Sequence, residues 1–166
     1  MNHADRFVRT LGLVLVLGLA AGGFCTIGCA RDAQREDGGT RPWPAASEVS
    51  AAALDQELKI PAAGEKPVIV YVGPGGLFGL GHIPGAVAHG PGSSPDGLAD
   101  LKAWAQGVAK NSSIVIYCGC CPLEDCPNLR PAFSALKDLG FARLRVLALP
   151  NNFNIDWVGQ GFAVEK

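Results

Sequence analysis

Three short apolar runs rich in valine, isoleucine and leucine constrain the fold of this chain more than any other feature. They are Pro67–Val72, Ser113–Tyr117 and Leu144–Leu149. Apolar residues follow one another in these runs instead of alternating with polar ones. Each run therefore predicts a strand that is buried on both faces, as the strands of parallel sheets are. A shorter strand is expected at Ala86–His89.

Segments with helical spacing of apolar residues separate these runs. They cover residues 47–60, 98–108 and 129–139, and Gly140 closes the last of them. Ser94, followed by a proline and an aspartate, predicts the start of the middle helix, because it offers a capping hydroxyl before a residue suited to the first turn. Strands that alternate with helices predict a single α/β domain, with a parallel central sheet flanked by helices on both faces.

The first residues have the pattern of an export signal. Arg6 and Arg9 precede an apolar run over residues 11–27, which is a charged segment followed by one that partitions into a bilayer. The run leads into Gly28 and Cys29, which resembles a bacterial lipoprotein signal, where a small residue precedes the lipidated cysteine. We expect a signal ending at Cys29 and a lipid anchor on that residue. An uncleaved anchor helix and an ordinary cleaved signal are the alternatives.

All three interpretations place the folded part in the cell envelope, facing the periplasm. Ala30 stands where an aspartate would mark retention in the inner membrane, so the outer membrane is favoured. Residues 30–46 are polar and contain several glycines and prolines, which predicts a flexible tether in which Trp43 is exposed. The folded domain is expected over residues 47–166. The net charge of −1 and the lack of a basic stripe argue against nucleic acid as a partner.

A cysteine-rich loop follows the second apolar run. Cys118 comes directly after the predicted strand, at the end where parallel sheets form their binding sites. Pro131 fits a helix that begins after Asn128 as N-cap, since a proline in the first turn removes no helical hydrogen bond. The free N–H groups of such a helix start favour an anion. We therefore expect Cys118 to be a thiolate nucleophile held over them, with Arg130 beside a bound anionic substrate.

Several segments, in the right order over residues 47–166, resemble the rhodanese family. Gly81–Ala86 looks like the signature before the second strand of rhodaneses, and Cys118 follows its strand as their catalytic cysteine does. Further similarity lies at Leu139–Phe141, at Trp157 and at Gly161–Glu165. The resemblance implies a rhodanese-like α/β domain that needs no cofactor.

The resemblance also implies a reaction. Cys118 would take sulfane sulfur from a small anionic donor such as thiosulfate, hold it as a persulfide, and pass it to a thiol or cyanide-like acceptor. The loop residues Gly119, Cys120 and Cys121 would surround the substrate together with Arg130. Two features depart from the family. The loop is longer and richer in cysteine, and residues 71–73 read Tyr-Val-Gly where the family commonly has Asp-Val-Arg.

The other cysteines of the loop leave three interpretations open. In the first, Cys126 pairs with Cys120 or Cys121 in a structural disulfide, which suits an exported protein. Alternatively, Cys120, Cys121 and Cys126 are resolving thiols that attack a persulfide or a sulfenate on Cys118. Finally, all four sulfurs could hold Zn²⁺ or Cu⁺. The corresponding alternative function is a non-catalytic binding module, and phosphate-ester or arsenate chemistry is a third possibility. His82 is interpreted as a residue that fixes a turn, in preference to a general base.

Overall fold

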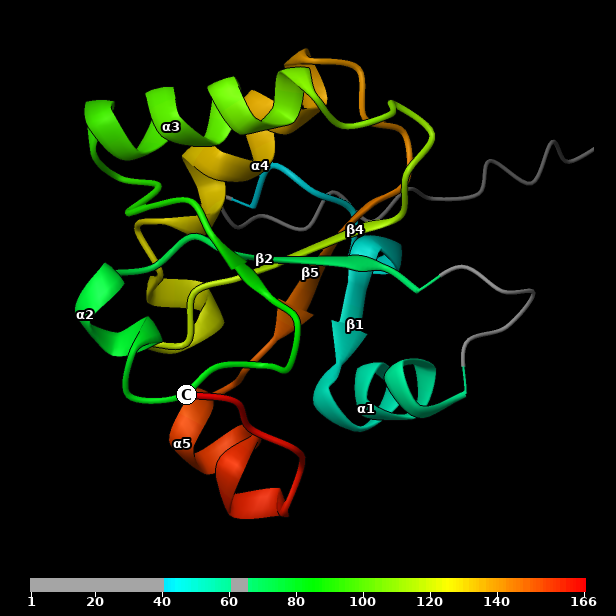
Figure 1. The fold of residues 1–166 in the computed structure, drawn as a ribbon, viewed down its shortest axis with the longest axis vertical. Helices are drawn as coiled ribbons and strands as arrows, with labels where there is room; N and C mark the ends of the chain where they lie inside the picture. Colours follow the sequence, from blue (N-terminus) through cyan, green and yellow to red (C-terminus); the bar gives the residue numbers. More distant parts are fainter. Residues whose placement is uncertain (1–40, 61–65) are drawn as a thin grey trace, which may run out of the picture. The chain divides into compact units, whose positions relative to one another are not determined.

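The computed structural model describes residues 41–60 and 66–166 of the chain. Five parallel strands form one sheet in the order β1-β5-β4-β2-β3. Helices α3 and α4 cover one face of this sheet, and α1 and α5 lie on the other (Figure 1). The predicted α/β class with helices on both faces is therefore confirmed. The elements are β1 (Glu48–Ser50), α1 (Ala51–Lys59), β2 (Val68–Tyr71), α2 (Gly75–Phe78), β3 (Val87–Ala88), α3 (Pro95–Gln106), β4 (Ile114–Tyr117), α4 (Leu129–Asp138), β5 (Leu144–Ala148) and α5 (Phe153–Asp156), with short 3-10 turns η1 (Ala45–Ser47), η3 (Leu123–Asp125) and η4 (Val158–Gln160).

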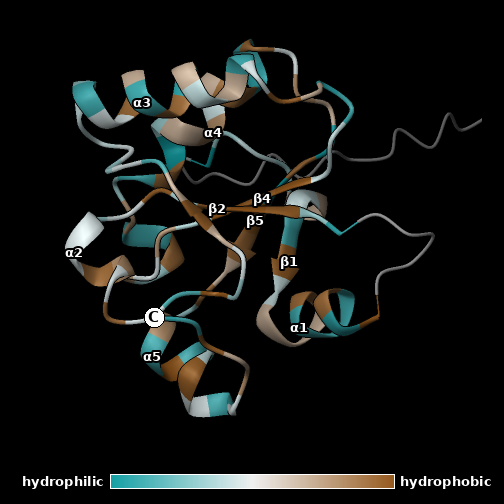
Figure 2. Cartoon of the chain, in the orientation of Figure 1, coloured by the Kyte–Doolittle hydropathy of each residue, from teal (hydrophilic) through white to brown (hydrophobic). Residues whose placement is uncertain are grey.

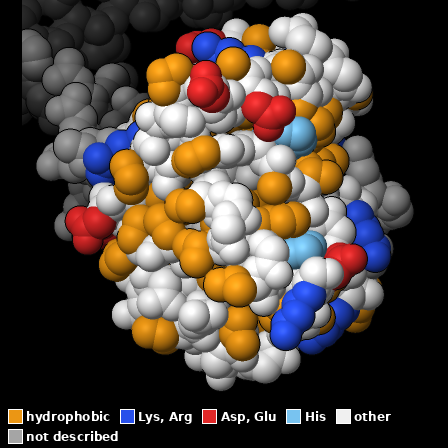
Figure 3. All heavy atoms as spheres, turned by 60° about the vertical axis from the view of Figure 1, so that its left-hand side comes forward, with side chains coloured by type: hydrophobic (Ala, Val, Ile, Leu, Met, Phe, Trp, Pro, Cys, Tyr) orange, Lys and Arg blue, Asp and Glu red, His pale blue; other side chains and the backbone are white. Residues whose placement is uncertain are grey.

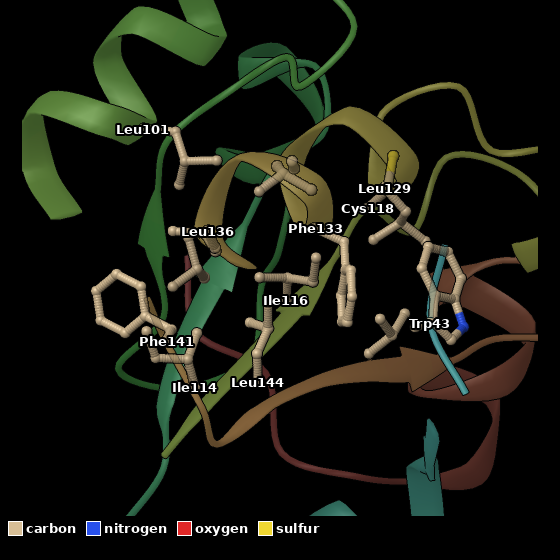
Figure 4. Close-up of a cluster of buried hydrophobic side chains, with 14 of the residues drawn as sticks. Trp43, Leu101, Ile114, Ile116, Cys118, Leu129, Phe133, Leu136, Phe141 and Leu144 are labelled. Carbon is tan, nitrogen blue, oxygen red and sulfur yellow. The ribbon is translucent and has the colours of Figure 1, made fainter. Parts of the chain in front are cut away.

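The three central strands carry apolar side chains on both faces because each face of the sheet packs into a separate hydrophobic core. Along β4, Ile114 and Ile116 face the core under α3 and α4, whereas Val115 and Tyr117 face the core on the side of α1 and α5. All four residues are at most 1% exposed. The hydrophobic colour of these strands stands out against the mixed colours of the helices (Figure 2). Figure 4 shows Cys118 at one end of the first core, near Leu129.

The predicted helix starts and ends agree with the structure for α3 and α4. The Ser94 hydroxyl accepts a hydrogen bond from the Gly97 N–H at 3.0 Å, and Pro95 occupies the first helical position. Helix α4 is followed by Gly140 at φ +90°, the left-handed conformation that commonly terminates helices. Asn128 stands at the N-cap position of α4, as predicted, but its side chain makes no capping hydrogen bond.

Residues 48–50 differ from the prediction, because they form an edge strand and not the first turn of a helix. In this strand, Val49 pairs with Leu147 of β5. The helix begins only after Ser50, whose Oγ accepts from the Ala53 N–H at 3.2 Å. A strand of three residues is too short to show the two-residue alternation of apolar and polar side chains. Its conformation is selected by pairing with the edge of β5.

Trp43 also differs, since it was predicted to be an exposed residue of the tether. It is 5% exposed and packs on Phe133 of α4, with the ring centroids 5.3 Å apart. Its indole N–H donates to the Glu48 carboxylate at 2.9 Å. The segment from Arg41 to Ala46 thus contributes to the core under α4.

The expected signal and Cys29 lie outside the described residues. Within residues 41–60 and 66–166, none of the helices combines the length and apolar composition that crossing a bilayer requires.

Candidate functional site at the cysteine loop

The cysteine loop, residues 118–128, connects the end of β4 with the start of α4. Its first turn depends on Gly119, which adopts φ +78°. A Cβ at this position would lie 2.8 Å from the Cβ of Phe153, so a side chain would be both strained and crowded. The Gly119 carbonyl accepts a hydrogen bond from the Phe153 N–H at 3.0 Å. This turn folds the chain back, so that Cys120 returns over the residue from which the loop starts.

The four sulfurs of the loop gather as the sequence predicts. The Sγ atoms of Cys118 and Cys120 are 3.1 Å apart, and those of Cys120 and Cys121 are 3.2 Å apart. The Sγ atoms of Cys118, Cys120 and Cys126 all lie within 4.8 Å of one another. All four cysteines are free thiols, so neither disulfide considered above is present in this structure. Of the four sulfurs considered as metal ligands, those of Cys118, Cys120 and Cys126 are the ones grouped closely enough to bind one ion together.

The main chain of the helix start lies close to the sulfur of Cys126. The main-chain N–H groups of Asn128 and Leu129 donate to the sulfur of Cys126. Cys126 precedes the helix by only a few residues, so the chain carries its sulfur directly over the first free N–H groups. The N–H donor to the Cys118 sulfur comes instead from Cys120.

The surroundings of Cys118 and Cys126 shift the pKa values of these two buried thiols in opposite directions. The hydrogen bond with Cys118, together with the N–H groups of the helix start, lowers the pKa of Cys126 to about 6, although burial opposes the shift. The same hydrogen bond and burial raise the pKa of Cys118. The two shifts favour negative charge on Cys126 over Cys118. The thiolate expected on Cys118 stays a prediction. Burial also raises the pKa of Cys121, to about 12.

Asn128 is a positioning residue that sequence reasoning assigned only to helix capping. Its side chain is 3% exposed, and its Nδ2 donates to the sulfur of Cys118 at 3.2 Å. Its Oδ1 accepts from the main-chain N–H of Ser93 at 3.1 Å. An asparagine before a helix has an ordinary explanation as a cap. Nothing near Asn128 in the sequence indicates that the main chain of residues 90–94 passes close enough to donate a hydrogen bond to its Oδ1.

The charged residues of the loop lie at its outer side. Glu124 and Asp125 are exposed, as predicted, and Glu124 forms an ion pair with Arg41. Arg130, in the first turn of α4, donates through Nη2 to the main-chain oxygen of Glu124 at 2.8 Å. This hydrogen bond fastens η3 to the helix. The expected role of Arg130 beside a substrate stays a prediction.

A cavity of about 500 Å³ opens beside the loop. Gly119 and Cys120 line it, together with four apolar side chains, which are Leu77 of α2, Leu80 just after α2, Val158 of η4 and Val164 of the C-terminal segment. Polar residues of the lining are Asn152, Asn154 and Lys166. Figure 3 brings the α2 side of the domain forward and shows many hydrophobic side chains on this face. Cys120 is thus the cysteine of the loop that reaches the cavity wall, while Cys118 lies behind it at 2% exposure.

Packing explains why residues 71–73 depart from the Asp-Val-Arg of rhodaneses. Tyr71 fills the space beside Tyr117, with the ring centroids 5.2 Å apart, and its hydroxyl donates to the carbonyl of Pro74 at 3.0 Å. A Cβ on Gly73 would lie 2.5 Å from the Tyr71 hydroxyl and 2.8 Å from the Cys118 carbonyl oxygen. A side chain at position 73 therefore has no room.

His82 has the structural role that was predicted for it. Its ring Nδ1 lies 3.1 Å from the main-chain oxygen of Phe78, and the two rings stack at 3.8 Å. Its main chain exchanges two hydrogen bonds of 2.9 Å with Glu165. These contacts fix the turn around the Gly81–Ala86 segment.

Comparisons with known proteins agree with this architecture. No family model and no curated protein matches the sequence. Among solved structures, BH2092 from Bacillus halodurans has a TM-score of 0.55 and 23% identity, over 71% of this chain and 75% of its own. The rhodanese-like domain of Alr3790 from Anabaena sp. has a TM-score of 0.53 and 22% identity, over 72% of this chain and 78% of its own. EanB, solved with hercynine, has a TM-score of 0.50 and 22% identity over 72% of this chain and 27% of its own. The chain therefore has the rhodanese-like fold.

Proposed function

We propose that this domain is an envelope sulfurtransferase, which moves sulfane sulfur from a small anionic donor to a thiophilic acceptor through a persulfide on Cys118. The observation that carries the proposal is the position of Cys118. It stands at the carboxyl end of a central strand of a rhodanese-like fold, with the Asn128 amide donating to its sulfur at 3.2 Å and the Cys126 sulfur within 4.8 Å. A nucleophilic thiol needs such a partner to take its proton, because the thiolate is the reactive form.

The first half of the reaction begins with a proton transfer. The Cys118 thiol gives its proton to the Cys126 thiolate, whose Sγ lies within 4.8 Å of the Cys118 Sγ. The Cys118 thiolate then attacks the outer sulfur of thiosulfate. The S–S bond of the donor breaks, and sulfite leaves with the electron pair. The resulting persulfide anion remains close to the Asn128 amide and the Cys120 N–H, which stabilise its charge.

The second half regenerates the enzyme. Cyanide or a thiolate attacks the outer sulfur of the persulfide, which leaves as thiocyanate or as a new persulfide. The bond electrons return to Cys118, and the Cys118 thiolate takes its proton back from Cys126. No net oxidation occurs over the cycle, so the reaction needs no cofactor.

Mass spectrometry of the purified full chain tests the proposal. After incubation with thiosulfate, we expect a mass gain of one sulfur atom, located on Cys118, and its loss on treatment with cyanide. The Cys118→Ser variant should show neither. If wild type and Cys118→Ser are equally inert towards thiosulfate and other sulfane donors, the proposal is wrong.

The envelope location depends on the sequence pattern around Gly28 and Cys29. A lipid on Cys29 would hold the domain at a membrane, with the outer membrane favoured, because each buried CH₂ contributes about 0.8 kcal/mol. Incorporation of a labelled fatty acid tests this, and it should be lost in Cys29→Ser.

The proximity of three sulfurs supports a second candidate function, which is the binding of a soft metal ion. The Sγ atoms of Cys118, Cys120 and Cys126 lie within 4.8 Å of one another, and thiolates favour Cu⁺ and Zn²⁺. The same mass measurement under native conditions separates the two functions. A retained metal ion would favour a binding module, whereas a cyanide-labile sulfur favours the transferase.

A further inference from the structure

We propose that Cys120 is a second sulfur carrier, which receives the sulfane sulfur from the Cys118 persulfide and presents it to acceptor thiols that are too bulky to reach Cys118. This inference rests on the proposed persulfide chemistry and adds the residue through which the sulfur leaves. The two Sγ atoms are 3.1 Å apart, yet they differ in access. Cys118 is 2% exposed, whereas Cys120 is exposed and lines the cavity beside the loop.

The backbone holds the two sulfurs together. Gly119 at φ +78° reverses the chain between them, and its carbonyl is held by the Phe153 N–H. The N–H of Cys120 donates to the sulfur of Cys118, so the second cysteine follows the first whenever this turn is formed. A side chain in place of Gly119 would meet Phe153, so this turn requires glycine at position 119.

Access decides which acceptors each sulfur can serve. A small ion such as cyanide needs little room, but the thiol of a peptide or a protein brings its neighbouring atoms with it. Cys118 lies behind the cavity wall, which excludes such an acceptor. The cavity of about 500 Å³ on the Cys120 side is large enough to admit the end of a peptide-sized thiol, and apolar side chains such as Leu77 and Val164 form its wall.

The distance between the sulfurs requires a small movement. An S–S bond is about 2 Å long, so an outer sulfur held in line between the attacking sulfur of Cys120 and the leaving sulfur of Cys118 needs a separation of at least about 4 Å. The present separation of 3.1 Å must therefore open by at least about 1 Å. Cys120 can make this movement because its side chain is exposed, whereas Cys118 is packed in the core.

The transfer itself balances without any added oxidant or reductant. The Cys120 sulfur attacks the outer sulfur of the Cys118 persulfide, and the bond between that sulfur and Cys118 breaks. The electron pair returns to Cys118, which takes up the proton released by the Cys120 thiol. The acceptor thiolate then attacks the outer sulfur on Cys120, which gives the acceptor persulfide and restores Cys120.

A comparison of two acceptors tests this role in the full chain. Thiosulfate is the donor, and the rates of transfer to cyanide and to glutathione are measured for wild type, Cys120→Ser and Cys121→Ser. We expect the glutathione-to-cyanide ratio of the rates to fall at least about tenfold in Cys120→Ser, since exchange rates depend on access to the sulfur. Cys121→Ser is the matched cysteine-to-serine comparison, and it should lower the ratio less than Cys120→Ser does, because the contact with Cys118 belongs to Cys120.

Mapping of the sulfane sulfur by alkylation and mass spectrometry supplies the second readout. Sulfur should appear on both Cys118 and Cys120 in wild type, and on neither in Cys118→Ser. An unchanged rate ratio in Cys120→Ser, or sulfur loaded on Cys120 in Cys118→Ser, overturns the relay and leaves the persulfide proposal standing. A wild-type chain that gains no sulfur from any donor overturns the proposed function, and the relay fails with it.

Discussion

Asn128 offers the sharpest test of how the site stabilises charge, because its side chain makes two separate hydrogen bonds, one as donor and one as acceptor. Its Nδ2 donates to the sulfur of Cys118 at 3.2 Å, and its Oδ1 accepts from the N–H of Ser93 at 3.1 Å. Asn128→Ala removes both hydrogen bonds. Asn128→Asp keeps an acceptor for Ser93 but puts a carboxylate oxygen in place of the donor. The two variants should therefore fail in different ways.

The magnitudes follow from these contacts. Loss of two hydrogen bonds in a side chain that is 3% exposed should lower the free energy of unfolding of Asn128→Ala by about 1–3 kcal/mol. Loss of the donor to a charged sulfur is worth about 1.5–3 kcal/mol, so persulfide formation should slow by about ten- to a hundredfold. In Asn128→Asp, two unit charges at the 3.2 Å separation of the wild-type atoms repel by about 5 kcal/mol at an effective dielectric constant of about 20. We expect this variant to be slower still.

The pH dependence separates electrostatics from packing. The carboxyl of Asn128→Asp, buried close to the sulfurs of Cys118 and Cys126, is expected to have a folded-state pKa above its unfolded value. Its destabilising effect is therefore full above the folded-state pKa and disappears below the unfolded value, where the protonated group can donate as the amide does. The loss in free energy of unfolding of Asn128→Ala should not depend on pH in this way, because alanine has no titratable group.

Urea denaturation of both variants at about pH 7.5 and about pH 5, with thiosulfate loading followed by mass spectrometry, measures these effects. Equal losses in the two variants at both pH values would refute the electrostatic reasoning. A wild-type loading rate in Asn128→Ala would show that the amide does not stabilise the sulfur.

Three further predictions concern packing and titration. Trp43→Ala should lower the free energy of unfolding by about 3 kcal/mol in urea denaturation, because it leaves a cavity at the edge of the core. Gly97→Ala should destabilise α3 although alanine is the better helix former, since its Cβ would lie 2.2 Å from the Pro91 carbonyl oxygen. Gly107→Ala, with its nearest neighbour at 3.6 Å, is the matched control and should gain about 0.4–1 kcal/mol. Ultraviolet titration should detect a thiolate that appears as the pH rises through about 6 and is lost in Cys126→Ser. Because this pKa is lowered by folding, the ionised sulfur stabilises the fold above the unfolded value, and its contribution is lost as the pH falls through about 6.

The sequence predicted those parts of the fold that local patterns determine. The β-branched runs form β2, β4 and β5, as predicted. A strand that is buried on both faces is apolar at nearly every position, so a short continuous run is enough to identify it. Ser94 and Gly140 marked a helix start and a helix end through the conformations that these residue types favour. Each of these signals acts between residues that are close in the chain.

The misplaced parts depend on contacts between distant segments. Val49 fits a helical pattern as well as a strand, and only the free edge of β5 selects the strand. Trp43 lies among prolines and polar residues, and nothing near it in the chain indicates that Phe133 will receive its ring. The thiolate was expected on Cys118 because the loop was predicted to hold this residue over the helix start, and the sequence did not indicate that Cys126 would lie beside the same N–H groups. Both cysteines are close to that helix in a sequence-based view, and only coordinates distinguish them.

The donors at this site have a consequence for how it can work. Amide groups of Cys120, Asn128 and Leu129 donate to the two buried sulfurs. Amides do not titrate in the physiological range, so the field that they impose on the site is the same at every pH at which the domain folds. Gly73, where rhodaneses commonly carry an arginine, has no space for a side chain, and the negative charge is stabilised by the backbone and one asparagine instead. If ionised Cys126 accepts the proton of the Cys118 thiol, as proposed, sulfur loading should rise with pH through the same transition that the ultraviolet titration reports.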